Sequence, residues 1–445
     1  MLPVFVLDDA TPGGWRRGAA SRWWLHHSLS ALAADLARLG LPLVLRRGPA
    51  EAAIAALVQD SGATAVMWNR RYEPWNRQRD EGIKVALHAA GIEASSHNGA
   101  LLREPWEVTT GGGRPYQVFT PFWRALRSLP GPGQPLPVPS GMAAPDRAPA
   151  GDRLDDWALR PTRPDWAGGL SRTWTPGEAG ARERLASFLD RALPAYRTGR
   201  DRPDRDGTSM LSPHLHMGEV SPRTVWNAVE AADADGEAFL RELGWREFCH
   251  QLLFHHGDLA DAPLRPEFAR MPWRDDPQQL AAWQQGRTGY PIVDAGMRQL
   301  WQTGWMHNRV RMVAASFLVK DLLLPWQAGE AWFWDTLVDA DLANNAANWQ
   351  WVAGCGADAA PFFRVFNPVL QGEKFDPDGR YVRQFVPELA PLDDRWIHQP
   401  WAAPAEALHR AGIRLGRDYP WPIVDHAAAR QRALAALDHA KRVAA

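Results

Sequence analysis

The chain has 445 residues, of which 45% are hydrophobic and 23% are charged, as in an ordinary soluble globular protein. This composition excludes a disordered, collagen-like or coiled-coil chain, and the length predicts two or three domains of about 150 residues each. The sequence contains no run of about 18 apolar residues, so we expect no membrane span. Fifty basic and 51 acidic residues give a formal net charge of −1, which excludes nucleic-acid binding through overall positive charge.

The N-terminus and the cysteine content indicate a cytoplasmic protein. Residues 1–9 are expected to form a strand, because the stretch is too short and too acidic for a signal peptide. The two cysteines, Cys249 and Cys355, are too few for a disulfide framework or a cysteine zinc site.

The first 128 residues alternate short apolar runs with amphipathic stretches. The expected strands are residues 3–8, 42–46, 63–69 and 92–96, and the expected helices are 49–59, 76–90 and a stretch with Leu25, Leu29, Leu32, Leu36 and Leu39 on one stripe. Strands separated by helices predict a parallel sheet with right-handed crossovers. We therefore expect an α/β domain, doubly wound and Rossmann-like, over residues 1–128.

The rest of the chain is expected to be a linker followed by helices. Residues 130–149 contain seven prolines, which cannot form a regular element, so residues 129–174 are predicted to be an interdomain linker. Helix-start patterns follow at Thr175-Pro-Gly-Glu178, which has the spacing of a capping box, and at Ser221-Pro222. No alternating strand pattern follows, so the fold class of residues 175–445 is all-α.

Three segments of the helical part are rich in polar and aromatic residues. In the first, residues 207–223, the hydroxyls of Thr208, Ser209 and Ser212 lie before a helix. They either form an anion site for a phosphate or pyrophosphate or cap the helix, and spacing alone favours the cap. The pair His214-x-His216 lacks the further ligands of a metal shell, so we expect no metal site.

The second segment, residues 239–248, places Phe239, Glu242 and Trp245 three residues apart on one helix face. A carboxyl group between two aromatic rings is either a solvated neighbour of Arg246 or, inside a cavity, an acid that keeps its proton. The sequence by itself favours the solvated arrangement.

The third segment runs from residue 289 to 351. Asn308, Arg311 and Met312 share one helix face, and Asp341, Asn345 and Trp349 follow at four-residue steps. The acids Asp339 and Asp341 are compatible with a metal or with an ion pair to Arg309 or Arg311, and periodicity does not decide between them.

Together these motifs resemble the photolyase/cryptochrome family, specifically the bacterial class I cyclobutane pyrimidine dimer photolyases. The resemblance extends over essentially the whole chain, and its motifs occur in family order: Gly207-Thr-Ser-x-Leu-Ser-Pro, Trp245-Arg-Glu-Phe, Gly289-Tyr-Pro-Ile-Val-Asp-Ala, Gly304-Trp-Met-His-Asn-Arg, Asp339-x-Asp-Leu, Asn348-Trp-Gln-Trp and Gln371-Gly-Glu-Lys-Phe-Asp.

The resemblance implies that the helical domain is an FAD-binding domain that holds the cofactor in a bent conformation. The implied cofactor-binding residues are Tyr196, Thr208, Ser209, Met210, Leu211, Ser212, Phe239, Asn308, Arg311, Asp339, Ala340, Asp341 and Asn345. Arg311 is expected to pair with Asp339, and Asn345 to face flavin N5. An asparagine there is typical of the photolyase branch and of a fully reduced, anionic FAD.

The implied activity is that of a deoxyribodipyrimidine photo-lyase, a carbon–carbon lyase that repairs DNA in light. A pyrimidine dimer flips out of single- or double-stranded UV-damaged DNA, receives an electron from photoexcited reduced FAD, and splits into two pyrimidines. The implied catalytic residues are Glu242, which donates a proton to a thymine carbonyl, the walls Trp245 and Trp351, and the contacts Asn308 and Met312.

Two further sets of residues follow from the resemblance. Electrons are expected to reach oxidised flavin through Trp349, Trp326 and Trp273, three of the 24 tryptophans, and the other tryptophans are expected to pack. DNA contacts, which carry no sequence information, are expected from Arg200, Glu242, Trp245, Arg246, Asn308, Arg309, Trp351 and Gln371.

The alternative function is that of a cryptochrome-like blue-light photoreceptor without repair activity. Such a receptor is expected to carry a signalling extension, whereas this sequence ends in the alanine-rich stretch 427–445. A (6-4) photolyase fits less well, because that branch has two histidines where this chain has His307-Asn308. A third alternative, a helical nucleic-acid-binding module without catalysis, predicts a colourless protein. An antenna chromophore of unknown identity is possible, and we expect a monomer.

Overall fold

The computed structural model describes residues 1–359 and 363–444. The chain divides into two compact units. Unit 1 comprises residues 1–190, 209–257 and 338–342, and unit 2 comprises residues 191–208, 258–337 and 343–445. These units do not coincide with the predicted boundaries at 128 and 175, which remain a prediction.

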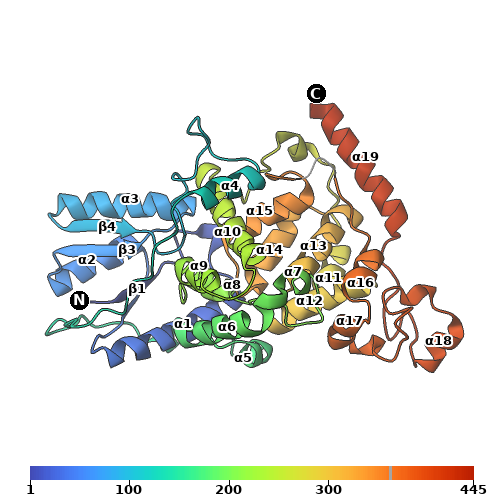
Figure 1. Cartoon of the computed structure of the whole chain (residues 1–445), viewed down its shortest axis with the longest axis horizontal. Helices are drawn as coiled ribbons and strands as arrows, with labels where there is room; N and C mark the ends of the chain where they lie inside the picture. The colour runs from blue at the N-terminus through green and yellow to red at the C-terminus, as the bar shows by residue number, and fades with distance from the viewer. Residues whose placement is uncertain (360–362, 445) are drawn as a thin grey trace. The chain divides into compact units, whose positions relative to one another are not determined.

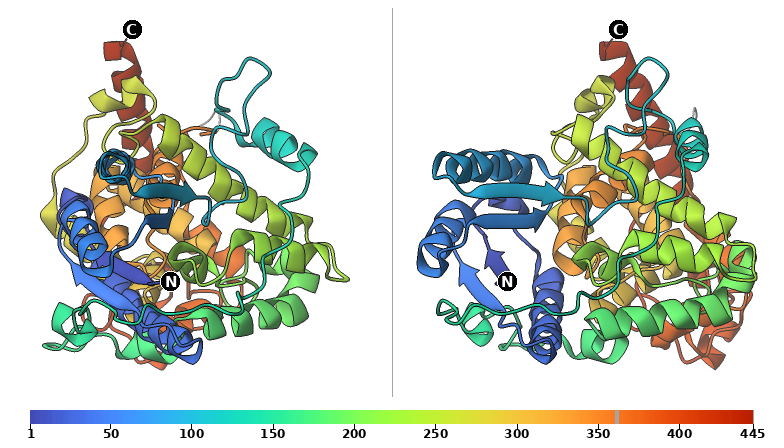
Figure 2. Two further views of the ribbon diagram at one scale, coloured as in Figure 1. Left: turned by 90° about the vertical axis from the view of Figure 1, so that its left-hand side faces the viewer. Right: turned by 60° about the vertical axis from the view of Figure 1, so that its left-hand side comes forward.

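Unit 1 contains the four expected strands in parallel pairs. Strand β1 (Val4–Leu7) pairs with β2 (Val44–Arg47), and β3 (Ala65–Asn69) pairs with β4 (Glu93–His97). The helices that connect them are α1 (Ala19–Arg38), α2 (Ala50–Ser61) and α3 (Pro74–Ala89), which lie beside the strands in Figures 1 and 2. The predicted α/β fold class is confirmed, although the strands form two hydrogen-bonded pairs where one continuous sheet was expected.

Apolar side chains connect the two strand pairs. One cluster joins Val6 of β1 to Val66 of β3 and to the helix residues Ala50 and Ile83. A second cluster packs Leu25 and Leu29 of α1 against the strands, whereas Leu32 and Leu39 of the same predicted stripe are 37% and 41% exposed. The apolar stripe of α1 is therefore buried only in its first half.

The proline-rich segment forms no helix or strand between residues 130 and 153, as predicted. It is followed by a short helical turn (Leu154–Trp157) and by α5 (Gly168–Thr173), which lies inside the predicted linker. The backbone N–H of Asp152 donates to the carbonyl of Leu45 on β2 at 2.8 Å. The end of the proline-rich segment is thus attached to strand β2.

The remaining helices of unit 1 are α4 (Phe119–Ser128), α6 (Glu178–Ser187), α8 (Ser212–Met217), α9 (Pro222–Glu230) and α10 (Glu237–His255). Helix α9 starts as predicted, with the Ser221 hydroxyl accepting from the N–H of Thr224 at 3.0 Å. The predicted capping box at Thr175 is wrong, because Gly177, at φ 108°, precedes α6 and makes no side-chain cap.

The regular elements of unit 2 among the described residues are helices joined by loops, apart from one isolated bridge between Leu415 and Tyr419. None of the described helices is both long and apolar enough to cross a membrane. Its α-helices are α7 (Tyr196–Gly199), α11 (Pro277–Gln284), α12 (Pro291–Thr303), α13 (Asn308–Ser316), α14 (Trp326–Thr336), α15 (Leu342–Ala353, whose first residue belongs to unit 1), α16 (Pro368–Phe375), α17 (Arg380–Phe385), α18 (Ala405–Arg410) and α19 (His426–Ala444).

The buried carboxyl group of Asp294 fixes the start of α12, and this role accounts for the aspartate in the motif Gly289–Ala295. Asp294 is fully buried and accepts hydrogen bonds from the N–H and hydroxyl of Thr288, the N–H of Gly289 and the hydroxyl of Tyr419, at 2.6–3.0 Å. A buried carboxyl group needs such partners to offset its desolvation. The aspartate of this motif therefore has a structural role.

Candidate active site

The loop Ser209–Ser212 does not cap the helix that follows it. Helix α8 has no side-chain cap, and the hydroxyl of Ser212 instead donates to the carboxylate of Asp339 at 2.6 Å. Met210 lies in the left-handed region at φ 50°, a conformation that costs energy for a residue with a side chain and is concentrated at functional sites. The cap interpretation is therefore wrong for these hydroxyls, and the anion site remains a prediction.

Asp341 is held ionised by two histidines of unit 1. His216 Nδ1 lies 3.2 Å and His250 Nε2 lies 3.5 Å from the same carboxylate oxygen. Burial opposes ionisation, but the two imidazoles hold the pKa of Asp341 well below its ordinary value. Burial also lowers the pKa of His216, and the Nδ1 of this histidine faces the Asp341 carboxylate. Among the described residues, no group of three or more His, Cys, Asp or Glu side chains is arranged so that it could hold a metal ion.

Helix α10 carries the residues predicted for the substrate side of unit 1. Glu242 and Trp245 are half-buried, and the Trp245 ring stacks on Phe119 of α4, with centroids 3.8 Å apart and planes at 10°. Phe239 is buried against Phe188, with centroids 4.5 Å apart. One face of Trp245 is thus covered by Phe119, a residue that no motif indicated.

Arg246 and Glu247 connect α10 to the α/β part of unit 1. Arg246 donates to the carbonyl of Ala100 at 2.6 Å, and Glu247 accepts from the N–H groups of Leu102 and Arg103 at 2.9 and 3.1 Å. The Arg246 side chain is only 12% exposed. It has a structural role in this unit, and its expected DNA contact remains a prediction.

The N-terminal face of α13 carries three predicted residues of unit 2. Asn308 is exposed, while Arg309 and Met312 are half-buried and in contact, with Arg309 Nη1 3.8 Å from the sulfur. Arg309 also pairs with Asp201 at 2.8 Å and lies over the Phe375 ring at 4.5 Å. The structure therefore brings together Asn308, Arg309 and Met312 on one surface.

Arg200 and Gln371 are further predicted residues of unit 2. Arg200 lies 5.6 Å from the ring centre of the buried Tyr196, and Gln371 is one turn before Phe375 on α16.

Arg311 is a predicted cofactor residue of α13, and it donates to the Met306 carbonyl at 2.7 Å. Its expected partner Asp339 and the buried Ala340 belong to unit 1, so that pairing remains a prediction. The predicted residue Thr208 is half-buried.

Helices α14 and α15 pack closely around Gly329. A Cβ atom at Gly329 would lie 2.1 Å from the Trp349 ring, so only glycine fits there. One turn earlier on α15, the buried Asn345 donates from Nδ2 to the carbonyl of Glu330 at 3.0 Å. Asn345 and Trp349 are thus fixed on the same face of α15.

Two of the predicted electron-transfer tryptophans, Trp349 and Trp326, are buried at 3% and 2% exposure, and Trp273 is half-buried. Because Trp273 is the most exposed of the three, this burial is compatible with an electron-transfer path that ends at Trp273 near the surface.

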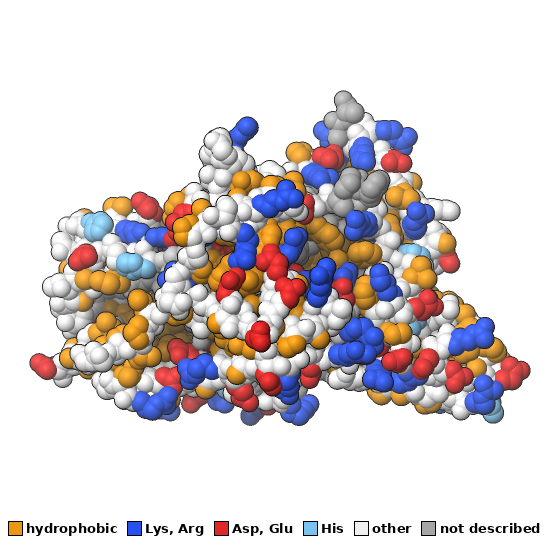
Figure 3. Space-filling view, viewed as in Figure 1, with side chains coloured by type: hydrophobic (Ala, Val, Ile, Leu, Met, Phe, Trp, Pro, Cys, Tyr) orange, Lys and Arg blue, Asp and Glu red, His pale blue; other side chains and the backbone are white. Residues whose placement is uncertain are grey.

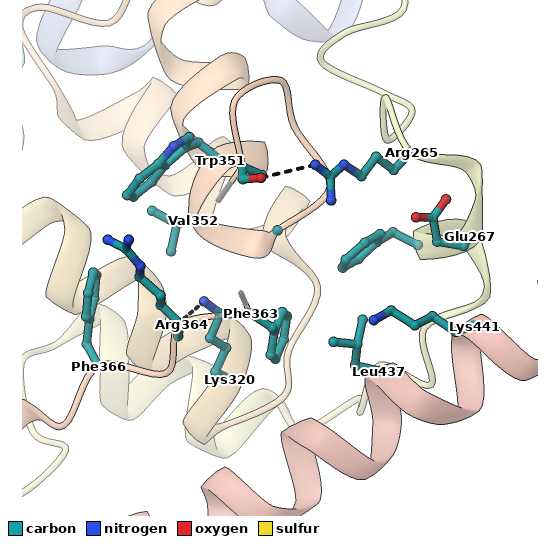
Figure 4. A pocket seen from close by; sticks show the side chains of 13 residues that line it. Arg265, Glu267, Lys320, Trp351, Val352, Phe363, Arg364, Phe366, Leu437 and Lys441 are labelled. Carbon is teal, nitrogen blue, oxygen red and sulfur yellow. Dashed lines mark hydrogen bonds between the residues drawn. The ribbon is translucent and has the colours of Figure 1, made fainter. Parts of the chain in front are cut away.

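Trp351 lines a basic cavity in unit 2, shown in Figure 4. The cavity also contains Arg265, Lys320, Arg364 and Lys441. Lys320 donates to the carbonyl of Arg364, and burial lowers the pKa of its ammonium group to about 7. The Trp351 indole N–H donates to the carbonyl of Asp358 at 3.2 Å.

Sequence reasoning missed these cavity cations. Lys320 had a usable signal, because it is one of only four lysines and directly follows the apolar run 317–319.

Comparisons with known proteins cover the whole chain. Residues 1–140 match the family described as DNA photolyase, and residues 239–439 match the FAD binding domain of DNA photolyase. The deoxyribodipyrimidine photo-lyase of Agrobacterium fabrum is 53% identical over 99% of this chain and 93% of its own length. Cryptochrome-1 of Arabidopsis thaliana is 40% identical over 97% of this chain, which spans 65% of that relative.

A solved structure extends this similarity to the fold. The crystal structure of a bacterial class III photolyase from Agrobacterium tumefaciens matches with a TM-score of 0.96 and 52% identity, over 99% of this chain and 92% of that one. The expected class I is not supported by this match. At these identities and coverages, the chain belongs to the photolyase/cryptochrome family.

Proposed function

We propose that this protein is a deoxyribodipyrimidine photo-lyase that repairs pyrimidine dimers in UV-damaged DNA in light. The observation that carries the proposal is 53% identity to a deoxyribodipyrimidine photo-lyase over 99% of the chain. The similarity to a class III photolyase structure supports class III as its type, in place of class I. When bound and reduced, FAD supplies the photoexcited electron that opens the cyclobutane ring.

The side chains around the loop Ser209–Ser212 fit FAD. A loop with a left-handed residue at Met210 and a hydroxyl tied to Asp339 is a preformed polar cradle. Ser212 would hold the pyrophosphate and ribityl part, Asp339 would lie at the ribityl, and the ionised Asp341 would accept N–H groups at the flavin edge. The proposed cofactor set otherwise comprises Tyr196, Thr208, Ser209, Met210, Leu211, Phe239, Asn308, Arg311, Ala340 and Asn345.

The exposed and half-buried side chains would contact the substrate. Glu242 would donate to a thymine carbonyl, and Trp245, backed by Phe119, would stack on the flipped dimer. Asn308 and Met312 would contact the dimer from α13, and Trp351 from α15. Stacking on a rigid ring is independent of sequence, which suits an enzyme that recognises a lesion.

The DNA backbone would be held by local groups of cations, namely Arg200, Arg246 and Arg309, with Gln371 beside them. On the face in Figure 3, basic side chains form several small groups with acidic side chains between them. Phosphate contacts of this kind make affinity strongly dependent on salt.

The remaining assignments belong to the same proposal. The tryptophans Trp349, Trp326 and Trp273 would reduce oxidised flavin in light. We retain residues 1–128, 129–174 and 175–445 as the α/β domain, linker and FAD-binding domain, with a monomer in the cytoplasm and an antenna chromophore of unknown identity.

The test uses the purified flavoprotein, chemically reduced and mixed with an oligonucleotide that contains a thymine dimer. Blue light should restore the thymine absorbance, and E242Q should lower the repair yield while its flavin content stays unchanged. E183Q, at an exposed glutamate, is the matched control. An unchanged yield in E242Q would refute the role of Glu242. No repair by the flavin-loaded wild type would favour the photoreceptor alternative, which the cryptochrome similarity keeps open.

A further inference from the structure

The imidazole of His250 on α10 lies between a carboxylate and a backbone carbonyl of unit 1. Its Nε2 is 3.5 Å from a carboxylate oxygen of Asp341, and its Nδ1 is 2.9 Å from the carbonyl oxygen of Arg246, one turn earlier on the same helix. The side chain is buried, and the Tyr72 ring packs against it at 87°, with ring centroids 6.1 Å apart. Both ring nitrogens of His250 therefore face oxygen atoms.

These two oxygen neighbours restrict the protonation of the His250 ring. A carbonyl and an ionised carboxylate only accept hydrogen bonds, whereas a neutral imidazole has a single N–H. In either neutral tautomer, one nitrogen lone pair would face an oxygen lone pair. Only the doubly protonated ring offers an N–H to each oxygen, so the contacts of His250 favour a positive charge.

His216 is less suited to supply a positive charge, although its Nδ1 lies 3.2 Å from the same oxygen of Asp341. Burial lowers the pKa of His216, and the positive charges of Arg17 and Arg71 act in the same direction. Burial of Asp341 opposes its ionisation, and His250 is the largest of the influences that nevertheless hold its pKa well below the ordinary value. The charge of Asp341 is therefore balanced mainly by His250.

A packing role alone would not require a positive charge on α10. A neutral glutamine in place of His250 could also donate to the Arg246 carbonyl and contact Asp341. Burial raises the pKa of Glu247, the other acid with which His250 interacts, and Glu247 already accepts two backbone N–H groups. The charge of His250 is thus directed at Asp341, the residue proposed to accept N–H groups at the flavin edge.

We propose that His250 is a positively charged positioning residue that acts through Asp341 to favour the reduced, anionic form of the bound flavin. The inference rests on the proposed function, in which Asp341 lies at the flavin edge. Reduction takes up two electrons and one proton, so the reduced cofactor carries one more negative charge than the oxidised cofactor. Without the charge of His250, the ionised Asp341 would repel this added charge. The protein would then bind reduced flavin less tightly relative to oxidised flavin, and the reduction potential would fall.

The experiment measures the midpoint potential of the bound flavin by dithionite titration against a reference dye. H250Q keeps hydrogen-bonding groups and removes the charge. It should weaken the binding of reduced relative to oxidised flavin about tenfold, which lowers the potential of this two-electron couple by about 30 mV. H250K keeps a positive charge and should restore most of the potential. H255Q, at an exposed histidine on the same helix, is the matched control and should keep the wild-type potential.

Nitrogen NMR of the oxidised flavoprotein, labelled at histidine, is a second readout that does not involve repair. At pH 8 the wild type should show an imidazole protonated on both nitrogens, and H250Q should lack this signal. Equal potentials in wild type and H250Q, no recovery in H250K, or no doubly protonated ring in the wild type would each overturn the inference.

Flavin absorbance and thermal unfolding check that each variant is folded. If H250Q does not fold, the wild-type spectrum decides, and H250K identifies the His250 signal by its loss. Dimer repair by the chemically reduced wild type is measured separately. Failure of that repair would count against the proposed function and leave the potential and the NMR measurement valid.

Discussion

Glu330 offers a direct test of how burial controls ionisation in this protein. Its side chain is fully buried on α14, and neither carboxyl oxygen has a hydrogen-bond partner among the described residues. Desolvation, together with the negative charge of Asp261, raises the pKa of Glu330 to about 9 from an ordinary value of 4.5. The folded protein therefore keeps this carboxyl group protonated at neutral pH, whereas the unfolded chain releases the proton.

The sign and size of the effect follow from proton linkage. Between pH 4.5 and about 9 the folded state binds one more proton at Glu330 than the unfolded state. Stability from this group is therefore fully present below pH 4.5 and is lost as the pH rises towards 9. The slope is about 1.4 kcal/mol per pH unit, which amounts to about 2.7 kcal/mol between pH 6 and pH 8.

The perturbation is E330Q, which preserves the shape of the side chain and removes its titration. Urea unfolding of the wild type and of E330Q at pH 6, 7 and 8 gives the free energy of unfolding of each. The difference between the two proteins should change by about 2.7 kcal/mol across this range, in the direction that favours E330Q at high pH. Taking the difference cancels the titration of all other groups. E373Q, at an exposed glutamate, should show a constant difference from the wild type.

A difference between wild type and E330Q that stays constant from pH 6 to pH 8 would refute the reasoning. It would mean that Glu330 ionises in the folded state with an ordinary pKa, and so has a charged or polar partner. If the difference in the free energy of unfolding between wild type and E373Q also changed by about 2.7 kcal/mol from pH 6 to pH 8, the effect would not be specific to the buried position.

Three further outcomes are expected. G329A should lower the free energy of unfolding by about 1–3 kcal/mol in urea titrations, because its Cβ would overlap the Trp349 ring; unchanged stability would contradict the close packing. S212A should cost about 1.5–3 kcal/mol by the same measurement, through loss of the hydrogen bond to Asp339, and a smaller change would show that water replaces the hydroxyl. Burial lowers the pKa of Lys320 from 10.5 to about 7, so the contribution of this group to stability, opposite in sign to that of Glu330, rises by about 1.4 kcal/mol per pH unit above pH 7. K320M should remove this rise relative to the wild type, and a parallel pH profile would contradict it.

The strands and first helices could be predicted because their apolar periodicity is local. The predicted strand at 63–69 appears as β3 (Ala65–Asn69), and the predicted helix at 76–90 as α3 (Pro74–Ala89). The predicted start of α6 was wrong because Gly177 takes a backbone conformation with φ 108°, which only glycine adopts easily. Helix α5 was missed because six residues are too few to show a helical period.

In the candidate site, only contacts between residues of the same helix could be predicted from the sequence. Helical spacing grouped Asn308 with Met312 and Asn345 with Trp349, and these pairs do share faces of α13 and α15. Spacing could not indicate that Asp341 meets His216 and His250, because these three residues come from different elements. It also could not identify Glu330, since a single glutamate in a helix is normally solvated.

The short segment Trp245–Glu247 has a consequence for how this protein can evolve. Trp245 stacks on Phe119, whereas the next two side chains bond the backbone of residues 100–103. One turn of α10 thus serves both a stacking surface and the anchorage of the α/β part. A substitution that displaces this turn is therefore expected to disturb both the Trp245–Phe119 stack and the attachment of α10 to residues 100–103, so the two contacts are constrained to change together.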